Sequence, residues 1–422
     1  FNRQAKIRYA REDLLPKISQ LIEAGIWDRT EAGELSLEAQ KYLSHDPKLA
    51  EYLSKSTIPT SIETEPPGAK IYMKKYNAPE SEWQYLGFSP IENIKLPIGF
   101  FRWRMEKERY ETVFAVSPTF EPIWGGPQFY APYNIVRVLD KKGSLPPGMV
   151  RVKGEPPLKQ GPIYEIAVEG ISKLNDFFID QYEVTNRQFK EFMDKGGYRK
   201  KEFWKQKFIK DGKELTWEKA VKEFADQTGQ PGPSTWQGGD YPKGQDDYPV
   251  SGVSWYEAAA YAEFVGKSLP TASHWGIARG AYTPMVITIG FLNLLGPLSN
   301  FKGEGPAPVG SNPGMTSYGA YDMAGNVREW CWNEAPNGRL IRGGAWNDVN
   351  YLFEIWSQAP PFDRSPKNGF RCAFYPEPEK IPMQAFDPCQ MIEGEDYSKE
   401  KPVPNSIFQI YKEQFSYDKT PL

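Results

Sequence analysis

The most informative stretch of this chain is YGAYDMAGNVREW, at residues 318–330. It places Asp322 before a Gly325-Asn326 turn and adds a second carboxylate at Glu329. Together these groups can direct oxygens to one point, which suits calcium because that ion takes about six to eight oxygen ligands. The same carboxylates can instead satisfy turn amides and a neighbouring arginine, and the sequence leaves both interpretations open.

Four further stretches complete a pattern around this one. They are PPGMVRVKG (146–154), DFFIDQYEVTNRQFKEFMDKGGY (176–198), YPVSGVSWYEAAAYAEFVGKSLPTASHW (248–275) and RLIRGGAWN to NGFRCAFY (339–375). In this order the five blocks resemble the formylglycine-generating enzymes, also called sulfatase-modifying factors. The resemblance implies an α+β, loop-rich domain over residues 146–376, with the formylglycine-generating variant of the C-type-lectin fold. A composition of 37 Gly, 38 Pro and 14% aromatic residues is typical of such a loop-rich domain.

The resemblance also implies a set of calcium ligands. They correspond to the side chains of Asp322 and Glu329 and to the carbonyl oxygens of Gly325 and Val327. Aspartate stands at position 322 where some members have asparagine, and its charge is expected to strengthen binding. Calcium would then be structural rather than catalytic.

The oxidase chemistry of the family is not expected here. Those members convert a sulfatase cysteine into formylglycine with copper(I) held by two cysteines that follow an Arg-Gly-Gly-Ser segment. This chain has Ala345 in place of the serine, and no cysteine occurs between Cys331 and Cys372. Soft copper(I) requires such thiolates, so copper is not expected. Iron is not expected either, because His45 and His274 cannot form the three-histidine site of the related sulfoxide synthases.

Two residues that could carry chemistry are interpreted as structural. The usual family partner of Cys372 is missing, because the corresponding segment is YAEF (261–264), so a buried free thiol is expected. Cys331 and Cys389 stay open as alternative partners. His274 is interpreted as a satisfied structural histidine, since no paired nucleophile accompanies it.

The family's substrate groove corresponds to a group of aromatic and basic residues near the end of the domain. These residues are Trp346, Asn347, Trp356, Phe362 and Arg364. Aromatic rings beside an arginine suit a peptide or glycan ligand, whereas core packing is the alternative. The segment 235–255 is expected to be a surface loop that closes onto this groove.

Local patterns predict two helix starts. Thr185 or Asn186 can cap a helix whose Phe189 and Phe192 face inward. In the N-terminal segment 1–56, apolar residues recur at three- and four-residue steps, which predicts helices with a break before Pro47.

Residues 57–120 contain short alternating runs separated by Pro- and Gly-containing turns, which predicts a small antiparallel β domain. Its stretch IETEPPGAKIYM (62–73) resembles the PEGA domain, a spacer without catalytic residues. An extended connector is expected over 121–145 and an extended C-terminal linker and tail over 377–422.

The sequence favours a non-catalytic recognition module for a peptide, glycan or protein ligand over an enzyme. A net charge of −3 and a pI near 5.8 argue against nucleic acid as a partner. An enzyme with altered chemistry in the same groove and a variable C-type-lectin-like binding protein are the alternatives. The domain order resembles bacterial proteins that begin with a serine/threonine kinase and a membrane helix. It implies attachment to such parts outside this chain, in the periplasm or at the cell surface rather than in the cytoplasm.

Overall fold

The computed structural model describes residues 3–25, 29–122, 130–132, 134–154, 173–280, 292–353, 355, 357–389 and 404–414. They belong to two units, Phe1–Cys389 and Gln390–Leu422, of which the second contains helix α10 (Asn405–Gln414). No helix within these ranges combines the length and the apolar character that crossing a bilayer requires.

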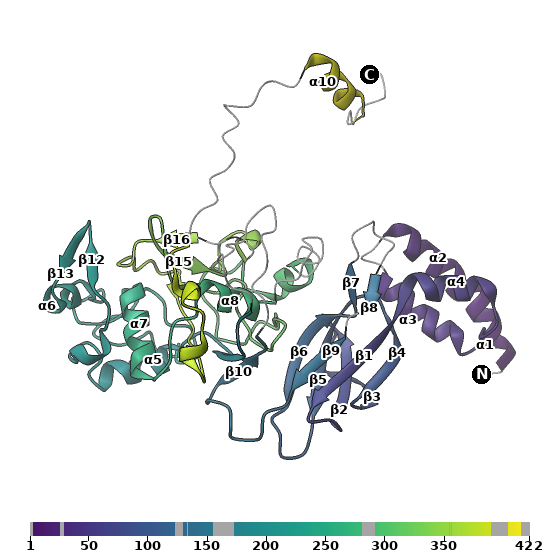
Figure 1. Ribbon diagram of the computed structural model, residues 1–422, viewed down its shortest axis with the longest axis horizontal. Coiled ribbons are helices and arrows are strands. Elements are labelled where there is room, and N and C mark those ends of the chain that lie inside the picture. Colours follow the sequence, from purple (N-terminus) through teal and green to yellow (C-terminus); the bar gives the residue numbers. More distant parts are fainter. Residues whose placement is uncertain are drawn as a thin grey trace. The chain divides into compact units, whose positions relative to one another are not determined.

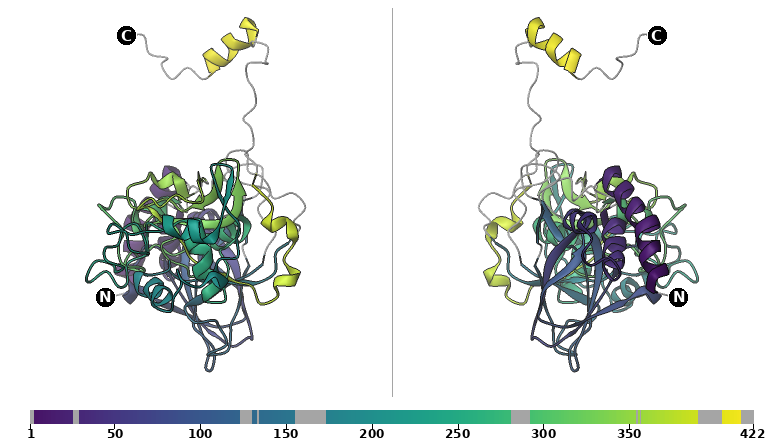
Figure 2. Two further views of the ribbon diagram at one scale, coloured as in Figure 1. Left: turned by 90° about the vertical axis from the view of Figure 1, so that its left-hand side faces the viewer. Right: turned by 90° about the vertical axis from the view of Figure 1, so that its right-hand side faces the viewer.

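The N-terminal part is a small helical bundle (Figure 2). It consists of α1 (Arg3–Tyr9), a π-helical turn (Ala10–Leu14), α2 (Leu15–Ala24), α3 (Arg29–Gln40) and α4 (Pro47–Ser56). Helix α4 begins at the predicted break, because the Asp46 side chain accepts the N–H of Lys48 at 3.0 Å and Pro47 occupies the first turn. The predicted helical character of this segment is confirmed.

Two facing sheets follow the bundle (Figure 1). Their strands are β1 (Thr57–Glu65), β2 (Lys70–Lys75), β3 (Gln84–Phe88), β4 (Ile91–Pro97), β5 (Phe100–Glu106), β6 (Val113–Pro118) and β9 (Ile135–Val138). The orders are β4-β1-β9 and β3-β2-β5-β6, and a separate pair is formed by β7 (Phe120–Pro122) and β8 (Tyr130–Pro132). Buried residues of both sheets, including Ile62, Ile135 and Trp103, form one core.

The strands within 57–120 pair with one another antiparallel, as predicted, whereas β9 departs from the prediction of an extended connector. It lies within the expected connector, yet it pairs with β1 in parallel, with Ile135 opposite Ile62. Both isoleucines are fully buried in the core between the sheets. The gain from burying an apolar strand explains why this part of the connector joins the β structure.

The larger domain combines short strands, short helices and much loop, in agreement with the predicted α+β, loop-rich fold. Its elements are β10 (Met149–Val152), β11 (Phe177–Asp180), α5 (Asn186–Asp194), β12 (Phe208–Lys210), β13 (Lys213–Leu215), α6 (Trp217–Ala220), α7 (Trp255–Phe264), α8 (Ala272–Ala278), β14 (Arg328–Ala335), β15 (Gly338–Arg342), β16 (Ser357–Ala359), β17 (Asn368–Gly369) and β18 (Ala373–Phe374). The main sheets have the orders β10-β11-β18 and β16-β15-β14-β17.

Helix α5 confirms the predicted cap and inward face. Thr185 and Gln188 form a capping box, in which Gln188 N–H donates to the Thr185 hydroxyl and the Thr185 N–H donates to the Gln188 side chain. Phe189 and Phe192 are fully buried, with ring centroids 5.3 Å apart.

The prediction that 235–255 is a surface loop is confirmed for 237–248, whose residues are exposed or half-buried, and is wrong for Trp236 and for 249–255, which are buried. Trp236, Val250 and Trp255 are buried in the same aromatic core as helix α5. The indole of Trp236 donates to Asn186 Oδ1 at 3.1 Å, so this ring finds both apolar contacts and a polar partner inside the domain.

Candidate functional site

The loop after β15 carries two of the predicted groove residues and opens them to solvent. Trp346 is half-buried and Asn347 is exposed. Farther along the same loop, the side chains of Val349 and Tyr351 are 50% and 54% exposed. We call residues 346–351 the display loop, because it presents aromatic, apolar and amide groups on one short segment.

Asp348 fixes the display loop from beneath. Its carboxylate accepts four hydrogen bonds. Nε and Nη2 of Arg328 donate at 2.7 and 2.9 Å, Nζ of Lys367 at 3.1 Å and the N–H of Ala345 at 2.9 Å. Burial pushes the pKa of Asp348 upward, but the hydrogen bonds from Arg328 and Lys367 outweigh it and lower that pKa. An ionised Asp348 therefore anchors the loop.

Arg364 supports the interior of the domain instead. Its guanidinium donates to both oxygens of Glu257 on helix α7, at 2.9 and 3.1 Å, and to the carbonyl of Ala225 at 2.7 Å. The Glu257 side chain is fully buried, and that of Arg364 is only 11% exposed. The guanidinium of Arg364 is thus bound within the protein, which corresponds to core packing rather than to a ligand groove.

Phe362 also takes part in packing. Its ring stacks on Phe224 with centroids 5.5 Å apart and lies 4.9 Å from the ring of Tyr256. Packing thus accounts for the contacts of Phe362, as it does for those of Arg364. A groove role for Trp346 and Asn347 stays a prediction, and Trp356 lies outside the described residues.

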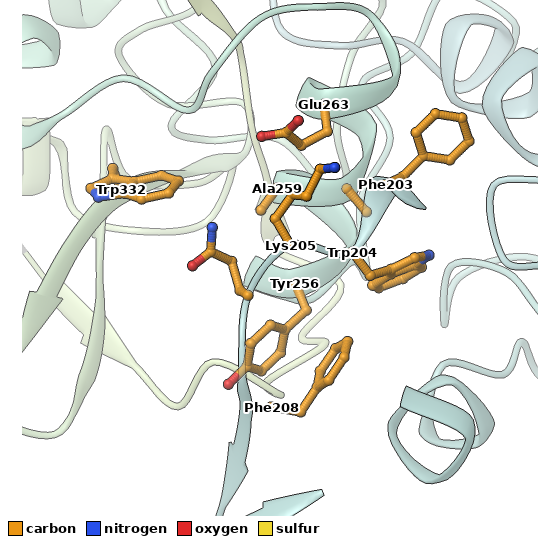
Figure 3. Close-up of a pocket in the computed structure, with 10 residues that line it drawn as sticks. Phe203, Trp204, Lys205, Phe208, Tyr256, Ala259, Glu263 and Trp332 are labelled. Atoms are coloured by element: carbon orange, nitrogen blue, oxygen red, sulfur yellow. The ribbon is translucent and has the colours of Figure 1, made fainter. Parts of the chain in front are cut away.

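A small aromatic notch lies beside helix α7. Figure 3 shows Trp332, from strand β14, on one side of the notch and Tyr256 and Glu263, both from α7, on another. Its volume of about 10 Å³ is roughly the space of one water molecule. The notch as described therefore has no room for a ligand group.

Glu329, the second predicted calcium ligand with a side chain, forms a buried ion pair. Nε and Nη2 of Arg371 lie 2.7 Å from its two oxygens, and neither side chain is exposed. The indole N–H of Trp275 donates to Glu329 Oε2 at 2.7 Å. Both carboxylate oxygens are thus engaged by strong donors.

Asp322 lies near this pair in a left-handed backbone conformation, with φ of 57°. Its Oδ2 accepts the N–H of Gly310 at 2.6 Å. Burial raises the pKa of Asp322 to about 6, against the opposing effects of the Gly310 N–H and Arg371. This carboxyl thus satisfies an amide of a neighbouring loop.

Glu183 is a third buried carboxyl at the same place. It accepts the side-chain amide of Asn326 at 2.6 Å and the N–H of Val327 at 3.1 Å. Burial, followed by the charges of Asp322 and Glu329, raises the pKa of Glu183 well above its usual range. The turn is therefore held by hydrogen bonds to Glu183.

These contacts correspond to the alternative in which the carboxylates satisfy turn amides and an arginine. A calcium ion at Asp322, Gly325, Val327 and Glu329 would require Glu329 to leave Arg371, and that would leave a buried guanidinium unpaired. In the described ranges, no group of three or more His, Cys, Asp or Glu side chains has the geometry to hold a metal ion. The side chains of Asp322 and Glu329 as arranged do not fit calcium, and chelation tests the calcium site that the resemblance implies.

The sequence interpretation assigned no role to three of these residues, Glu183, Asp348 and Arg371. Glu183 and Arg371 lie inside the quoted motif blocks, next to residues that are buried. A charged residue is rarely buried without a partner, so a charge embedded in an apolar motif is the signal that could have revealed them. Asp348 follows the RGGAWN block and is flanked by exposed residues, so its charge did not indicate a side chain with internal partners.

The thiols and His274 lack the properties of reactive groups. Cys331, Cys372 and Cys389 are buried and unpaired, and burial raises the pKa of each thiol, to about 11 for Cys389. Nδ1 of His274 forms a hydrogen bond of 2.6 Å with the Thr271 hydroxyl. Burial lowers the pKa of His274 to about 3. The structural interpretations of Cys372 and His274 are confirmed.

The fold and these motif blocks define a C-type-lectin-like domain of the formylglycine-generating type. Residues 137–375 match the family described as the sulfatase-modifying factor enzyme 1-like domain, and the chain belongs to this family.

Three relatives illustrate the range of the family. Serine/threonine-protein kinase pkn1 of Chlamydia caviae is 32% identical over 210 residues, covering 44% of this chain and 30% of that protein. The formylglycine-generating enzyme of Thermomonospora curvata is 31% identical over 230 residues, covering 44% of this chain and 69% of the enzyme. Inactive C-alpha-formylglycine-generating enzyme 2 of Bos taurus is 27% identical over 254 residues, covering 51% of this chain and 80% of that protein.

Proposed function

We propose that the large domain recognises a peptide, glycan or protein through its display loop and catalyses no reaction. The observation that carries this proposal is the combination of exposed Val349 and Tyr351 with the anchor Asp348, whose side chain is 6% exposed. A rigid support lowers the entropy that a loop loses on binding, so it favours recognition by the groups displayed.

The composition of the display loop suits a recognition surface. Trp346 and Tyr351 supply large, stiff contact areas, while Asn347 and Asn350 supply amides that can donate and accept hydrogen bonds. Aromatic residues of this kind are enriched among those that contribute most to binding.

The surrounding groups support a role without catalysis. A nucleophilic or copper-binding cysteine acts as thiolate, whereas burial keeps the three cysteines protonated near neutral pH. The low pKa of His274 and its full burial argue against a general base. The relative from Bos taurus, named as inactive, is a precedent for this scaffold without the oxidase activity.

The proposal is tested by selecting peptides from a displayed random library against the whole chain and measuring their affinities for variants. Trp346→Ala and Tyr351→Ala are expected to weaken the selected peptides about tenfold or more each. The matched control is Ile209→Ala on β12, another exposed apolar side chain at 43% exposure. Selected peptides whose affinity is unaffected by both loop variants would contradict a recognition role for the display loop.

We also propose that the domain is the sensing part of a kinase-linked receptor and lies outside the cytoplasm. The similarity to pkn1, over 30% of the length of that kinase, supports the link to a kinase, and the location is the part of the proposal that labelling tests. Labelling of intact producing cells with a membrane-impermeant amine reagent is expected to modify exposed lysines such as Lys243. Protection in intact cells with labelling after lysis would contradict the location.

A further inference from the structure

The sheet β3-β2-β5-β6 carries a row of large side chains on its outward face. Successive residues of a strand point to opposite faces, and Ile71, Met73 and Trp103 fill the core side. On the other face, the pairing register places Tyr85 opposite Tyr72, Tyr72 opposite Arg104 and Arg104 opposite Phe114. The row thus crosses all four strands of the sheet.

Several rings of this row are open to solvent. Tyr85, Phe88 and Phe114 are 52%, 57% and 36% exposed. Ring centroids are 5.4 Å apart between Tyr72 and Tyr85, and 6.1 Å apart between Tyr85 and Phe88. Trp83 extends the row, with its centroid 6.4 Å from that of Phe114. We call Tyr72, Trp83, Tyr85, Phe88 and Phe114 the aromatic row.

Two cations of this face, Arg104 and Lys74, are paired with carboxylates, while the exposed Lys70 lies opposite Phe88 on one side and Glu106 on the other. The guanidinium of Arg104 lies 4.3 Å from the centroid of Tyr72 and 5.0 Å from that of Trp83, and it pairs with Glu106 at 3.1 Å. Lys74 lies 5.0 Å from the Trp83 centroid and pairs with Glu80. Around Tyr72, Trp83 and Phe114 the face therefore offers aromatic rings and hydroxyl groups beside cations that are already paired.

We propose that the aromatic row binds a neutral polysaccharide chain. Sugar rings present C–H groups that pack on aromatic faces, while their hydroxyls pair with polar groups such as the phenols of Tyr72 and Tyr85. Neighbouring strands lie about 4.8 Å apart, so the distance from Tyr85 on β3 to Phe114 on β6 is roughly 14 Å, with Tyr72 and Arg104 between them, and this length suits an extended polymer. This site is separate from the display loop and independent of its proposed role.

Charge and direction favour a glycan over other polymers. A single-stranded nucleic acid needs a basic groove along its backbone, whereas Arg104 and Lys74 are paired with carboxylates. An extended peptide that adds to a sheet runs along an edge strand, whereas this row runs across the strands.

The test is calorimetric titration of the full chain with cellohexaose and chitohexaose. Saturable binding of at least one hexasaccharide is expected, and Tyr85→Ala and Phe88→Ala should each weaken it about five- to tenfold. Both side chains are more than half exposed, so the fold should tolerate their removal. The matched control is Tyr9→Ala, a similarly exposed tyrosine on helix α1, and Tyr351→Ala separates this site from the display loop.

Three results would overturn the proposal. The first is no binding of either hexasaccharide at millimolar concentration, and the second is binding that Tyr85→Ala and Phe88→Ala leave unchanged. The third is binding of oligo(dT) or of phosphatidylcholine vesicles, but of neither sugar, that depends on the same two residues.

Discussion

Arg371 and Glu329 face each other through two contacts of 2.7 Å, and neither side chain is exposed to solvent. The two residues are 42 positions apart and come from two different motif blocks. Their pairing joins strand β14 to the segment between β17 and β18. A predicted metal ligand is therefore part of an internal ion pair that holds the domain together.

Glu329→Gln should destabilise the domain strongly, because it leaves the guanidinium of Arg371 buried with its charge uncompensated. The expected loss in the free energy of unfolding is about 3–5 kcal/mol, measured by urea denaturation. The control is Glu334→Gln on the same strand, since the Glu334 side chain is 59% exposed and pairs with Arg339 at the surface. A loss for Glu329→Gln no larger than that of the control would show that the pair is dispensable.

Chelation should leave the melting temperature unchanged. Both oxygens of Glu329 are engaged by Arg371 and Trp275, so removing calcium should break no contact that the fold uses. The measurement compares thermal unfolding in excess EDTA with unfolding in millimolar calcium. A decrease of several degrees in EDTA would instead support the calcium ligands predicted at Asp322 and Glu329.

The stability of the Asp322→Asn variant, compared with that of the parent chain, should increase as pH rises. The pKa of Asp322 is about 6 in the fold, above the ordinary aspartate value near 3.8, so its ionised form destabilises the folded state. That cost is absent below the unfolded pKa and complete above about pH 6, and asparagine lacks it. Melting curves of both proteins from pH 4 to pH 7.5 test this, and a difference independent of pH would contradict it.

Arg364→Ala should destabilise the domain by about 3–5 kcal/mol, because it leaves the carboxylate of Glu257 buried without its cation. Chemical denaturation measures the loss. The control is Arg187→Ala, whose ion pair with Asp247 is exposed on both sides and should contribute about 1 kcal/mol or less. An Arg364 variant as stable as the control would restore the interpretation of Arg364 as a groove residue.

The family fold could be predicted because motif blocks and caps are local features. Thr185 caps α5 within a few residues of sequence, and the prediction needs no knowledge of distant partners. The direction of a side chain is not local: Arg364 turns inward because Glu257, 107 residues earlier, is buried beside it. Tyr351 was missed because no pattern in one sequence distinguishes an exposed tyrosine from a buried one.

The most direct test of the claim that the large domain lacks the catalysis of its family is an assay for the oxidase reaction. The full chain, supplied with copper(I) and a sulfatase peptide containing cysteine, is followed by oxygen uptake and by mass spectrometry of the peptide. The enzyme from Thermomonospora curvata serves as the positive control. We predict no oxygen uptake above background and an unmodified peptide, because Ala345 and the cysteine-free segment 332–371 provide no copper site. Catalytic conversion of the cysteine to formylglycine would contradict the central claim.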